Sequence, residues 1–334
     1  MGHNPTRPAF GNSFRCFRRP DPAMTRRDFI PGTALALTNC GQRHRKTIAV
    51  IPKANADLFF ITVRRGAEGA SRDLNLSIDW NGPDHETEYG RQIQIVDAMI
   101  ARRVDGLAIS ATDDNALVGP LQRVIHAGIP VTLFDSAANV EDYVSLIATD
   151  NSGAGRTAAG LMASLLPQGG SVAMLMQKPG GTSTELRERG FEEAIARSSP
   201  RLSIVARQYG MGDRAKSMAV AENILAAHPK LDGVFASSEA CSIGAIRALR
   251  ARGLAGKIKL ITFDLSDLHI EALRDGTAHV MLVQDAFRIG YEAVRSLSDK
   301  LAGRAPARRV DIPARVVEKA DLDKPEIRAL ITPV

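Results

Sequence analysis

Short apolar runs alternate along the chain with longer stretches in which apolar residues recur every three or four positions. The runs predict buried strands, and the stretches predict helices that lie with one face on a sheet. Strands are expected at 47–52, 76–80, 104–109, 130–134, 143–148, 171–176, 203–208, 231–236, 257–263 and 278–283. Helices are expected at 58–74, 86–103, between 110 and 129, and at 153–166, 182–198, 213–228, 239–252, 267–274 and 286–302, before strand-like runs at 309–312 and 315–317. This alternation predicts parallel sheets with helices on both faces.

The same pattern occurs twice in the chain. The matching pairs are Arg65-Gly66 with Arg189-Gly190, Asp105-Gly106 with Asp232-Gly233, and Phe134-Asp135 with Phe263-Asp264, at separations of 124, 127 and 129 residues. The repeat predicts two lobes of one design, each with an aspartate that ends a strand at the same place. Two such lobes enclose a cleft, and polar groups at strand ends in a cleft favour a small polar ligand.

The predicted fold is therefore α/β, with two similar doubly wound parallel-sheet lobes joined by a multi-strand hinge. Helix 286–302 is expected to pack back on the first lobe, so the chain crosses between lobes near 149–151, 284–285 and 311–314. The expected division is an N-terminal lobe of 47–149 plus 285–311, a C-terminal lobe of 150–284 plus 312–334, and a separate leader of 1–46. Several crossing segments suit lobes that open and close about a ligand.

The leader carries the excess positive charge. Residues 1–46 hold nine basic and two acidic side chains, whereas the remaining 288 residues carry 34 basic and 35 acidic ones, so the net charge of +6 indicates no nucleic-acid partner. Arg26-Arg27 precedes a short apolar segment, Phe29–Leu37, as in a twin-arginine export signal. The segment is too short to span a bilayer and ends at Cys40, where the sequence resembles a lipoprotein cleavage box except at Asn39. The alternatives to a lipidated twin-arginine signal are a plain cleavable signal and a chance Arg-Arg pair. Met24 is a second candidate for the first translated residue.

Motifs for catalysis and cofactors are weak or missing. The glycines of the segment 153–158 resemble a dinucleotide fingerprint, but residues 169–184 contain no acidic residue for the ribose, so we interpret the glycines as allowing close helix–strand packing. The sequence has no Walker loop, no nucleophile elbow and no metal-spaced histidines. Cys241 is the one cysteine after the leader, which excludes an internal disulfide there and suits a small core residue. We therefore expect no enzymatic activity, no cofactor and no metal. We interpret Asp135 and Asp264 as equivalent residues of the two repeats rather than as the paired carboxylates of a glycosidase.

Several segments together resemble a known family. They are Thr47–Val50 with Phe59-Phe60, Gly128–Asp135, Ile147–Asn151, Gly180–Ser183 with Arg187 and Phe191, Ala227–Pro229, Val234–Ala236 and Phe263-Asp264. From Thr47 to about Val317 the chain resembles a periplasmic sugar-binding protein of the ribose-binding type, the solute receptor of an ABC importer. The resemblance implies that aromatic rings hold the ligand and that Asp, Asn, Arg and Gln side chains bind its hydroxyl groups. Those roles fall on Phe59, Phe60, Asp135, Asn151, Arg187, Asp264 and Gln284.

The chain departs from ribose binders at several of these positions. Lys53, Asp57, Ser110, Ser136, Gly212 and Ser238-Glu239 differ from the residues expected there. Ribose itself is therefore doubtful, and a bulkier or substituted sugar is expected. Lys53 with Arg187 would suit an acidic sugar, unless Lys53 pairs with Asp57 or Asp135 inside the protein. The complete expected ligand-binding set is Lys53, Asp57, Phe59, Phe60, Ser110, Asp135, Asn151, Arg187, Ser238, Glu239, Asp264 and Gln284.

Two of these positions have an ordinary structural alternative. Phe60 fits the inward face of its helix and suits a core residue, and Arg187 has charged neighbours that suit a solvated surface.

The sequence thus favours an exported, monomeric substrate-binding protein that delivers a small polyhydroxylated ligand to ABC permease subunits and meets the membrane only through a lipid at Cys40. The alternatives are a receptor subunit for a chemoreceptor or sensor kinase, and a repressor-type sensor core. The repressor would need a DNA-binding headpiece, whereas residues 1–46 resemble an export signal.

Overall fold

The computed structural model describes residues 45–331. The twin-arginine pair and Cys40 lie outside the described residues, and Arg45–Val334 form one compact unit. Within 45–331, no helix is both long and apolar enough to cross a membrane.

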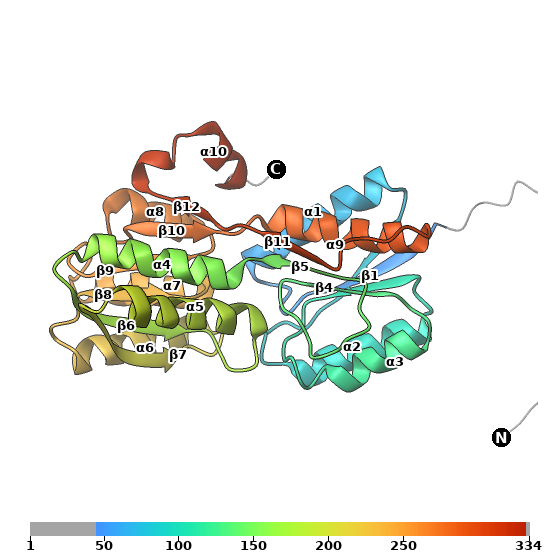
Figure 1. Cartoon of the computed structure of the whole chain (residues 1–334), viewed down its shortest axis with the longest axis horizontal. Coiled ribbons are helices and arrows are strands. Elements are labelled where there is room, and N and C mark those ends of the chain that lie inside the picture. The colour runs from blue at the N-terminus through green and yellow to red at the C-terminus, as the bar shows by residue number, and fades with distance from the viewer. Residues whose placement is uncertain (1–44, 332–334) are drawn as a thin grey trace, which may run out of the picture. The chain divides into compact units, whose positions relative to one another are not determined.

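Two six-stranded sheets organise this unit, and they have the same strand order (Figure 1). The first sheet, in the order β11-β5-β4-β3-β1-β2, contains β1 (Thr47–Ile51), β2 (Ser77–Trp80), β3 (Gly106–Ile109), β4 (Val131–Phe134), β5 (Ser145–Thr149) and β11 (Arg309–Ile312). The second, in the order β12-β10-β9-β8-β6-β7, contains β6 (Gly170–Met176), β7 (Leu202–Tyr209), β8 (Gly233–Ala236), β9 (Lys259–Phe263), β10 (Val280–Val283) and β12 (Arg315–Val317). All neighbours are parallel except β10 and β12. The predicted fold class is confirmed, and we call each sheet with its helices a lobe.

Helices cover both faces of each sheet, because the strands are apolar on both sides. In the first lobe, α1 (Leu58–Asp73) and α9 (Ala286–Leu301) cover one face, and α2 (Tyr89–Ala101) and α3 (Val118–His126) the other. In the second lobe, α4 (Asn151–Leu165) and α5 (Thr182–Ser198) lie opposite α6 (Arg214–Ala227) and α7 (Glu239–Ala251). The short helices α8 (Asp267–Asp275) and α10 (Pro325–Ile331) pack beside β10 and β12. Helix α9 thus returns to the first lobe, as the sequence predicted.

One helix begins later than its pattern predicted. The helix expected from residue 86 starts at Tyr89, because the Glu88 carboxylate accepts hydrogen bonds from the main-chain N–H groups of Asp84 and His85 at 3.0 and 2.9 Å and holds a turn there. Glu86 consequently lies in this turn rather than in α2, which leaves its side chain free to point into the space between the lobes.

Glycines bring helices of each lobe into close contact. A Cβ atom on Gly155 of α4 would overlap the main-chain carbonyl of Arg187 in α5. Likewise, a Cβ atom on Gly66 of α1 would overlap the carbonyl of Phe287 in α9. The expectation of helix–strand packing at the 153–158 glycines was therefore wrong at Gly155, which serves helix–helix packing instead.

Candidate functional site

A cavity lies between the lobes at the carboxyl ends of strands from both sheets. It contains about 460 Å³ of empty space, part of it open to solvent. Its lining consists of Lys53, Asp57, Phe59, Phe60, Glu86, Asp135, Gln177, Ser183, Thr184, Arg187, Arg214, Ser238, Glu239, Ala240, Asp264 and Gln284. Ligands of doubly wound sheets bind at this edge, outside the carboxyl ends of the strands.

Two aspartates project into the cavity from equivalent turns. Asp135 directly follows β4 and Asp264 directly follows β9, the corresponding strand of the second sheet. Both have left-handed backbone conformations, with φ of 56° and 70°, which are uncommon for residues other than glycine. Such conformations are held by their surroundings and gather at functional sites. The repeated aspartate predicted from the sequence therefore has the same backbone geometry in both lobes.

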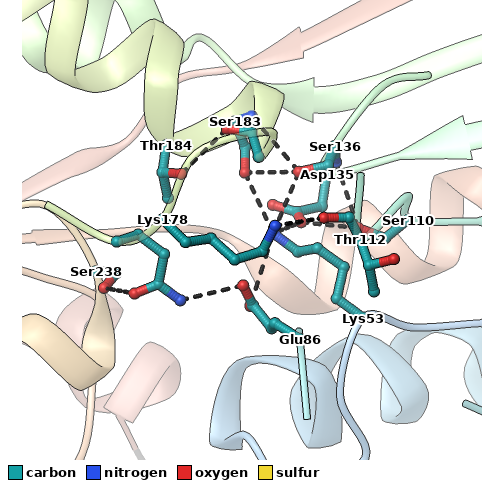
Figure 2. Close-up of polar contacts among 12 residues, drawn as sticks. Lys53, Glu86, Ser110, Thr112, Asp135, Ser136, Lys178, Ser183, Thr184 and Ser238 are labelled. Carbon is teal, nitrogen blue, oxygen red and sulfur yellow. Dashed lines mark hydrogen bonds and ion pairs between the residues drawn. The ribbon is translucent and has the colours of Figure 1, made fainter. Parts of the chain in front are cut away.

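Lys53, just after β1, pairs with two carboxylates on the first-lobe side of the cavity (Figure 2). Its Nζ lies 3.1 Å from Asp135 Oδ2 and 3.7 Å from Glu86 Oε1, and it donates to the hydroxyls of Ser136 and Ser183 at 3.2 and 3.4 Å. Burial works to lower the pKa of Lys53, but the two carboxylates outweigh burial and raise the pKa above its usual value. The ammonium is therefore charged and paired within the protein, which favours the pairing alternative over recognition of an acidic sugar.

Arg187 of α5 is fixed by the second lobe alone. Its Nε and Nη2 donate to Asn151 Oδ1 at 3.2 and 2.8 Å, its Nη1 donates to the Ser237 carbonyl, and its guanidinium lies 3.3 Å from the centre of the Phe263 ring. Burial lowers the pKa of Arg187, while Asp264 and Asp135 favour the charged form. Since the side chain is only 1% exposed, the solvated-surface alternative is wrong.

Asp264 is oriented by two donors. Gln284 Nε2 donates to Asp264 Oδ1 at 2.6 Å, and the main-chain N–H of Glu239 donates to Oδ2 at 3.1 Å. Gln284 in turn accepts a 2.6 Å hydrogen bond from Thr149 at the end of β5, which ties the second-lobe carboxylate to the first lobe. Burial raises the pKa of Asp264, and Arg187 opposes that effect.

Ten of the twelve expected ligand-binding residues line the cavity. The other two, Ser110 and Asn151, are buried behind it: Ser110 Oγ donates to Asp135 Oδ2 at 2.9 Å, and Asn151 accepts from Arg187. The structure therefore places both where they position a lining residue. Phe60 is 2% exposed in the first-lobe core and also lines the cavity, with its ring 5.0 Å from that of Phe59 in an edge-to-face pair. Its core interpretation is confirmed, and its contact with a ligand stays a prediction.

Six lining residues were not predicted: Glu86, Gln177, Ser183, Thr184, Arg214 and Ala240. Three of them could have been predicted from the internal repeat, as the second-lobe equivalents of expected first-lobe residues. The separation of 124 residues, added to Lys53, Phe59 and Phe60, gives Gln177, Ser183 and Thr184. Glu86 was missed because its position was assigned to a helix.

Polar contacts join the lobes across the cleft. They are Ser136 Oγ with Ser183 Oγ at 2.8 Å, Gln177 Nε2 to Glu86 Oε2 at 3.1 Å, Lys178 Nζ to the Thr112 carbonyl at 2.6 Å, Thr182 Oγ1 to the Ala137 carbonyl at 3.2 Å, and Asp114 N–H to the Gly180 carbonyl at 3.2 Å. The structure thus has the lobes closed on each other. Figure 2 shows the Lys53 and Lys178 side chains reaching this contact region.

Comparisons with known proteins agree with this geometry. The periplasmic binding protein domain family matches residues 48–305. The ribose import binding protein of Bacillus subtilis is 27% identical over 279 residues, covering 84% of this chain and 89% of its own. The D-ribose/D-allose-binding protein of Pseudomonas aeruginosa is 28% identical, covering 85% and 90%.

Solved structures give the same result. An ABC transporter solute-binding protein from Agrobacterium vitis with bound D-fucose has a TM-score of 0.83 and 31% identity, covering 86% of this chain and all of its own. A carbohydrate transporter solute-binding protein from Agrobacterium radiobacter in complex with D-arabinose has a TM-score of 0.83 and 29% identity, covering 87% and 100%. The chain therefore belongs to the periplasmic binding protein family and has the two-lobed α/β fold of its sugar-binding members.

Proposed function

We propose that this protein captures a small sugar or sugar-like ligand between its lobes and delivers it to an ABC import permease. The observation that carries the proposal is the pair of left-handed aspartates, Asp135 and Asp264, which face one cavity from opposite lobes. A sugar hydroxyl both donates and accepts hydrogen bonds, so carboxylates beside the Arg187 guanidinium satisfy both functions. The Phe59 ring supplies an apolar face for the C–H side of a sugar.

The relatives support this assignment. Those reported above are named for ribose import, ribose or allose binding, and solute binding with D-fucose or D-arabinose. Membership of the family implies a periplasmic location. We further propose that the Arg26-Arg27 segment directs export and that Cys40 carries a lipid anchor.

Closure of the lobes provides the signal to the permease. We place the hinge at the three chain crossings, near 149–151, 284–285 and 311–314, with the lobe boundaries expected from the sequence, and we propose that a monomer presents both lobes to the permease. A ligand that contacts both lobes favours the closed state by its differential affinity for that state.

A thermal-shift screen of ligand-free protein against pentoses and hexoses tests the proposal. A sugar at about 100 times its Kd should add about 2.7 kcal/mol to the free energy of unfolding. The shift should disappear in Asp264→Asn and persist in Asp142→Asn, an exposed position away from the cavity. A protein shown to be free of carried-over ligand that responds to no sugar would overturn the proposal.

A further inference from the structure

The charges that line the cavity do not balance. Its five carboxylates are those of Asp57, Glu86, Asp135, Glu239 and Asp264, and its three cations are those of Lys53, Arg187 and Arg214. Lys178 lies nearby, but its ammonium donates to the carbonyls of Thr112 and Pro179 at 2.6 and 3.2 Å and does not line the cavity. Even with Lys178 counted, carboxylates remain in excess.

The pairings within the protein locate this excess. Lys53 lies between Asp135 and Glu86, as described above. Asp264 is held by two N–H donors and lies in the field of Arg187. These contacts account for three of the five carboxylates.

Asp57 and Glu239 are the remaining two. Asp57 is the N-cap residue of α1, a position where a carboxylate usually accepts from the helix N–H groups, yet its side chain makes no such bond. Glu239 opens α7, and its Oε1 lies 2.5 Å from Arg214 Nη2. Its Oε2 is buried with no hydrogen-bond partner among residues 45–331, and the whole residue is 6% exposed. Both residues line the cavity, Asp57 with no helix N–H group bound to its side chain and Glu239 with one carboxylate oxygen paired to Arg214 and the other unpaired.

Closure of the cleft makes this arrangement costly. Asp57 belongs to the first lobe and Glu239 to the second, so closing brings two carboxylates into one desolvated space. Burial raises the pKa of Asp57 to about 6, with Glu86 adding to the effect. Burial, with a further contribution from the charge of Asp57, raises the pKa of Glu239 to about 7. Arg214 offsets part of this cost at both groups, and a second positive charge between them would relieve the rest.

From this geometry we infer that the ligand carries an ammonium group that binds between Asp57 and Glu239, while its hydroxyl groups bind Asp135 and Asp264. The inference rests on the proposed function and narrows its ligand class to amino sugars. It also reverses the expectation of an acidic sugar, because the charges of Lys53 and Arg187 are already engaged within the protein.

Calorimetric titration of matched sugar series tests the inference. Each series contains a neutral hexose (D-glucose, D-galactose or D-mannose), its 2-amino-2-deoxy derivative, and the N-acetyl form of that amine, which is neutral. In at least one series the amine should bind about tenfold or more tightly than both neutral members, because an ammonium adds an opposite charge to a hydrogen bond that a neutral donor makes to the same carboxylate. Titration is done below the pKa of the amine and at low salt, and the preference should weaken as salt screens the charges.

The outcomes separate this inference from the proposed function. If neutral hexoses bind as well as or better than their amines in every series, the receptor function stands and the amino-sugar inference falls. If no member of any series binds to ligand-free protein, the amino-sugar inference falls, and the proposed function falls with it only if the thermal-shift screen of pentoses and hexoses is negative as well.

Charge-removing variants locate the ammonium. Asp57→Asn and Glu239→Gln should each lower the affinity for the amine by about tenfold and leave affinity for the neutral hexose equal or higher. Asp142→Asn is the matched control and should leave the ratio of the two affinities unchanged. Equal losses for amine and neutral hexose in both carboxylate variants would mean that Asp57 and Glu239 only shape the cleft, and would overturn the inference.

Discussion

The contact between Arg187 and Asn151 offers a direct test of how the second lobe holds its guanidinium. Arg187→Met removes two hydrogen bonds to Asn151 Oδ1 and leaves that oxygen and the Ser237 carbonyl buried without a donor. Each unsatisfied acceptor costs about 1–3 kcal/mol. With the lost counter-charge for Asp264, the total is about 3–5 kcal/mol, the usual cost of breaking a buried charged pair. At about 2.1 cal/mol/K of unfolding entropy per residue, that corresponds to a fall in Tm of roughly 5–8 °C for a folded unit of this size.

A double-mutant cycle isolates the Arg187–Asn151 contact. Arg187→Met, Asn151→Ala and the double variant are unfolded in urea without ligand, after coincident transitions by two probes establish two-state behaviour. A charged hydrogen bond contributes about 1.5–3 kcal/mol, so the double variant should cost about 2 kcal/mol less than the sum of the single variants. Additivity within about 0.5 kcal/mol would refute the reasoning, and would mean that Asn151 does not position Arg187.

Three further expectations concern packing, pH and the buried lysine. Gly155→Ala should destabilise the protein by about 1–3 kcal/mol in urea unfolding, because its methyl group overlaps a main-chain carbonyl of α5. The control Gly160→Ala lies in the same helix with open space at the Cβ position and should stabilise the protein by about 0.5–1 kcal/mol. Equal effects of the two substitutions would contradict the close packing of α4 on α5. The pKa of Glu239 is raised from 4.5 to about 7, so between these pH values the folded state holds a proton that the unfolded state has lost. The contribution of Glu239 to the free energy of unfolding therefore falls as pH rises from about 4.5 to 7. The free energy of unfolding of Glu239→Gln should therefore be about 3 kcal/mol higher than that of the wild type at pH 8, and the difference should vanish at pH 4. If the unfolding free energies of the two proteins change in parallel with pH, the Glu239 charge is not buried. Lys53→Met should cost about 3–5 kcal/mol by leaving carboxylates unpaired, and adding Asp135→Asn should recover part of the loss; no recovery would argue against the ion pair.

Periodicity and repetition in the sequence predicted the architecture well, because both depend on local patterns. The apolar runs place most strands within a residue or two, and the repeated aspartate predicted equivalent turns after β4 and β9. The pattern failed at Glu86, where a turn held by the Glu88 carboxylate replaces the first turn of a helix. That event depends on one side chain rather than on periodicity, and it is also why the Glu86 carboxylate was not expected in the cavity.

The division between lining and supporting residues could not be read from the chain. The sequence predicts Ser110 and Asn151 as ligand-binding residues, but each side chain turns to a neighbouring charged group. Which of two adjacent polar side chains reaches the ligand depends on distances across the tertiary structure. The ion pair of Arg214 with Glu239 likewise depends on the tertiary structure, which brings the two residues together from separate helices.

The contacts that close the cleft have a consequence for how this receptor can diverge. Asp114 and Gly180 meet through their main-chain atoms, and Lys178 donates to the carbonyl of Thr112. A main-chain partner persists whatever side chain its position carries, so substitutions at Asp114 and Thr112 leave these two contacts in place. Lys178 and Gly180 are constrained, because the first donates through its side chain and the second has a φ of 78°, which favours glycine. Side chains in the cavity are then free to change and to select a new ligand while the closing motion is retained. A single scaffold of this kind can supply a series of importers with different cargoes from a few pocket substitutions each.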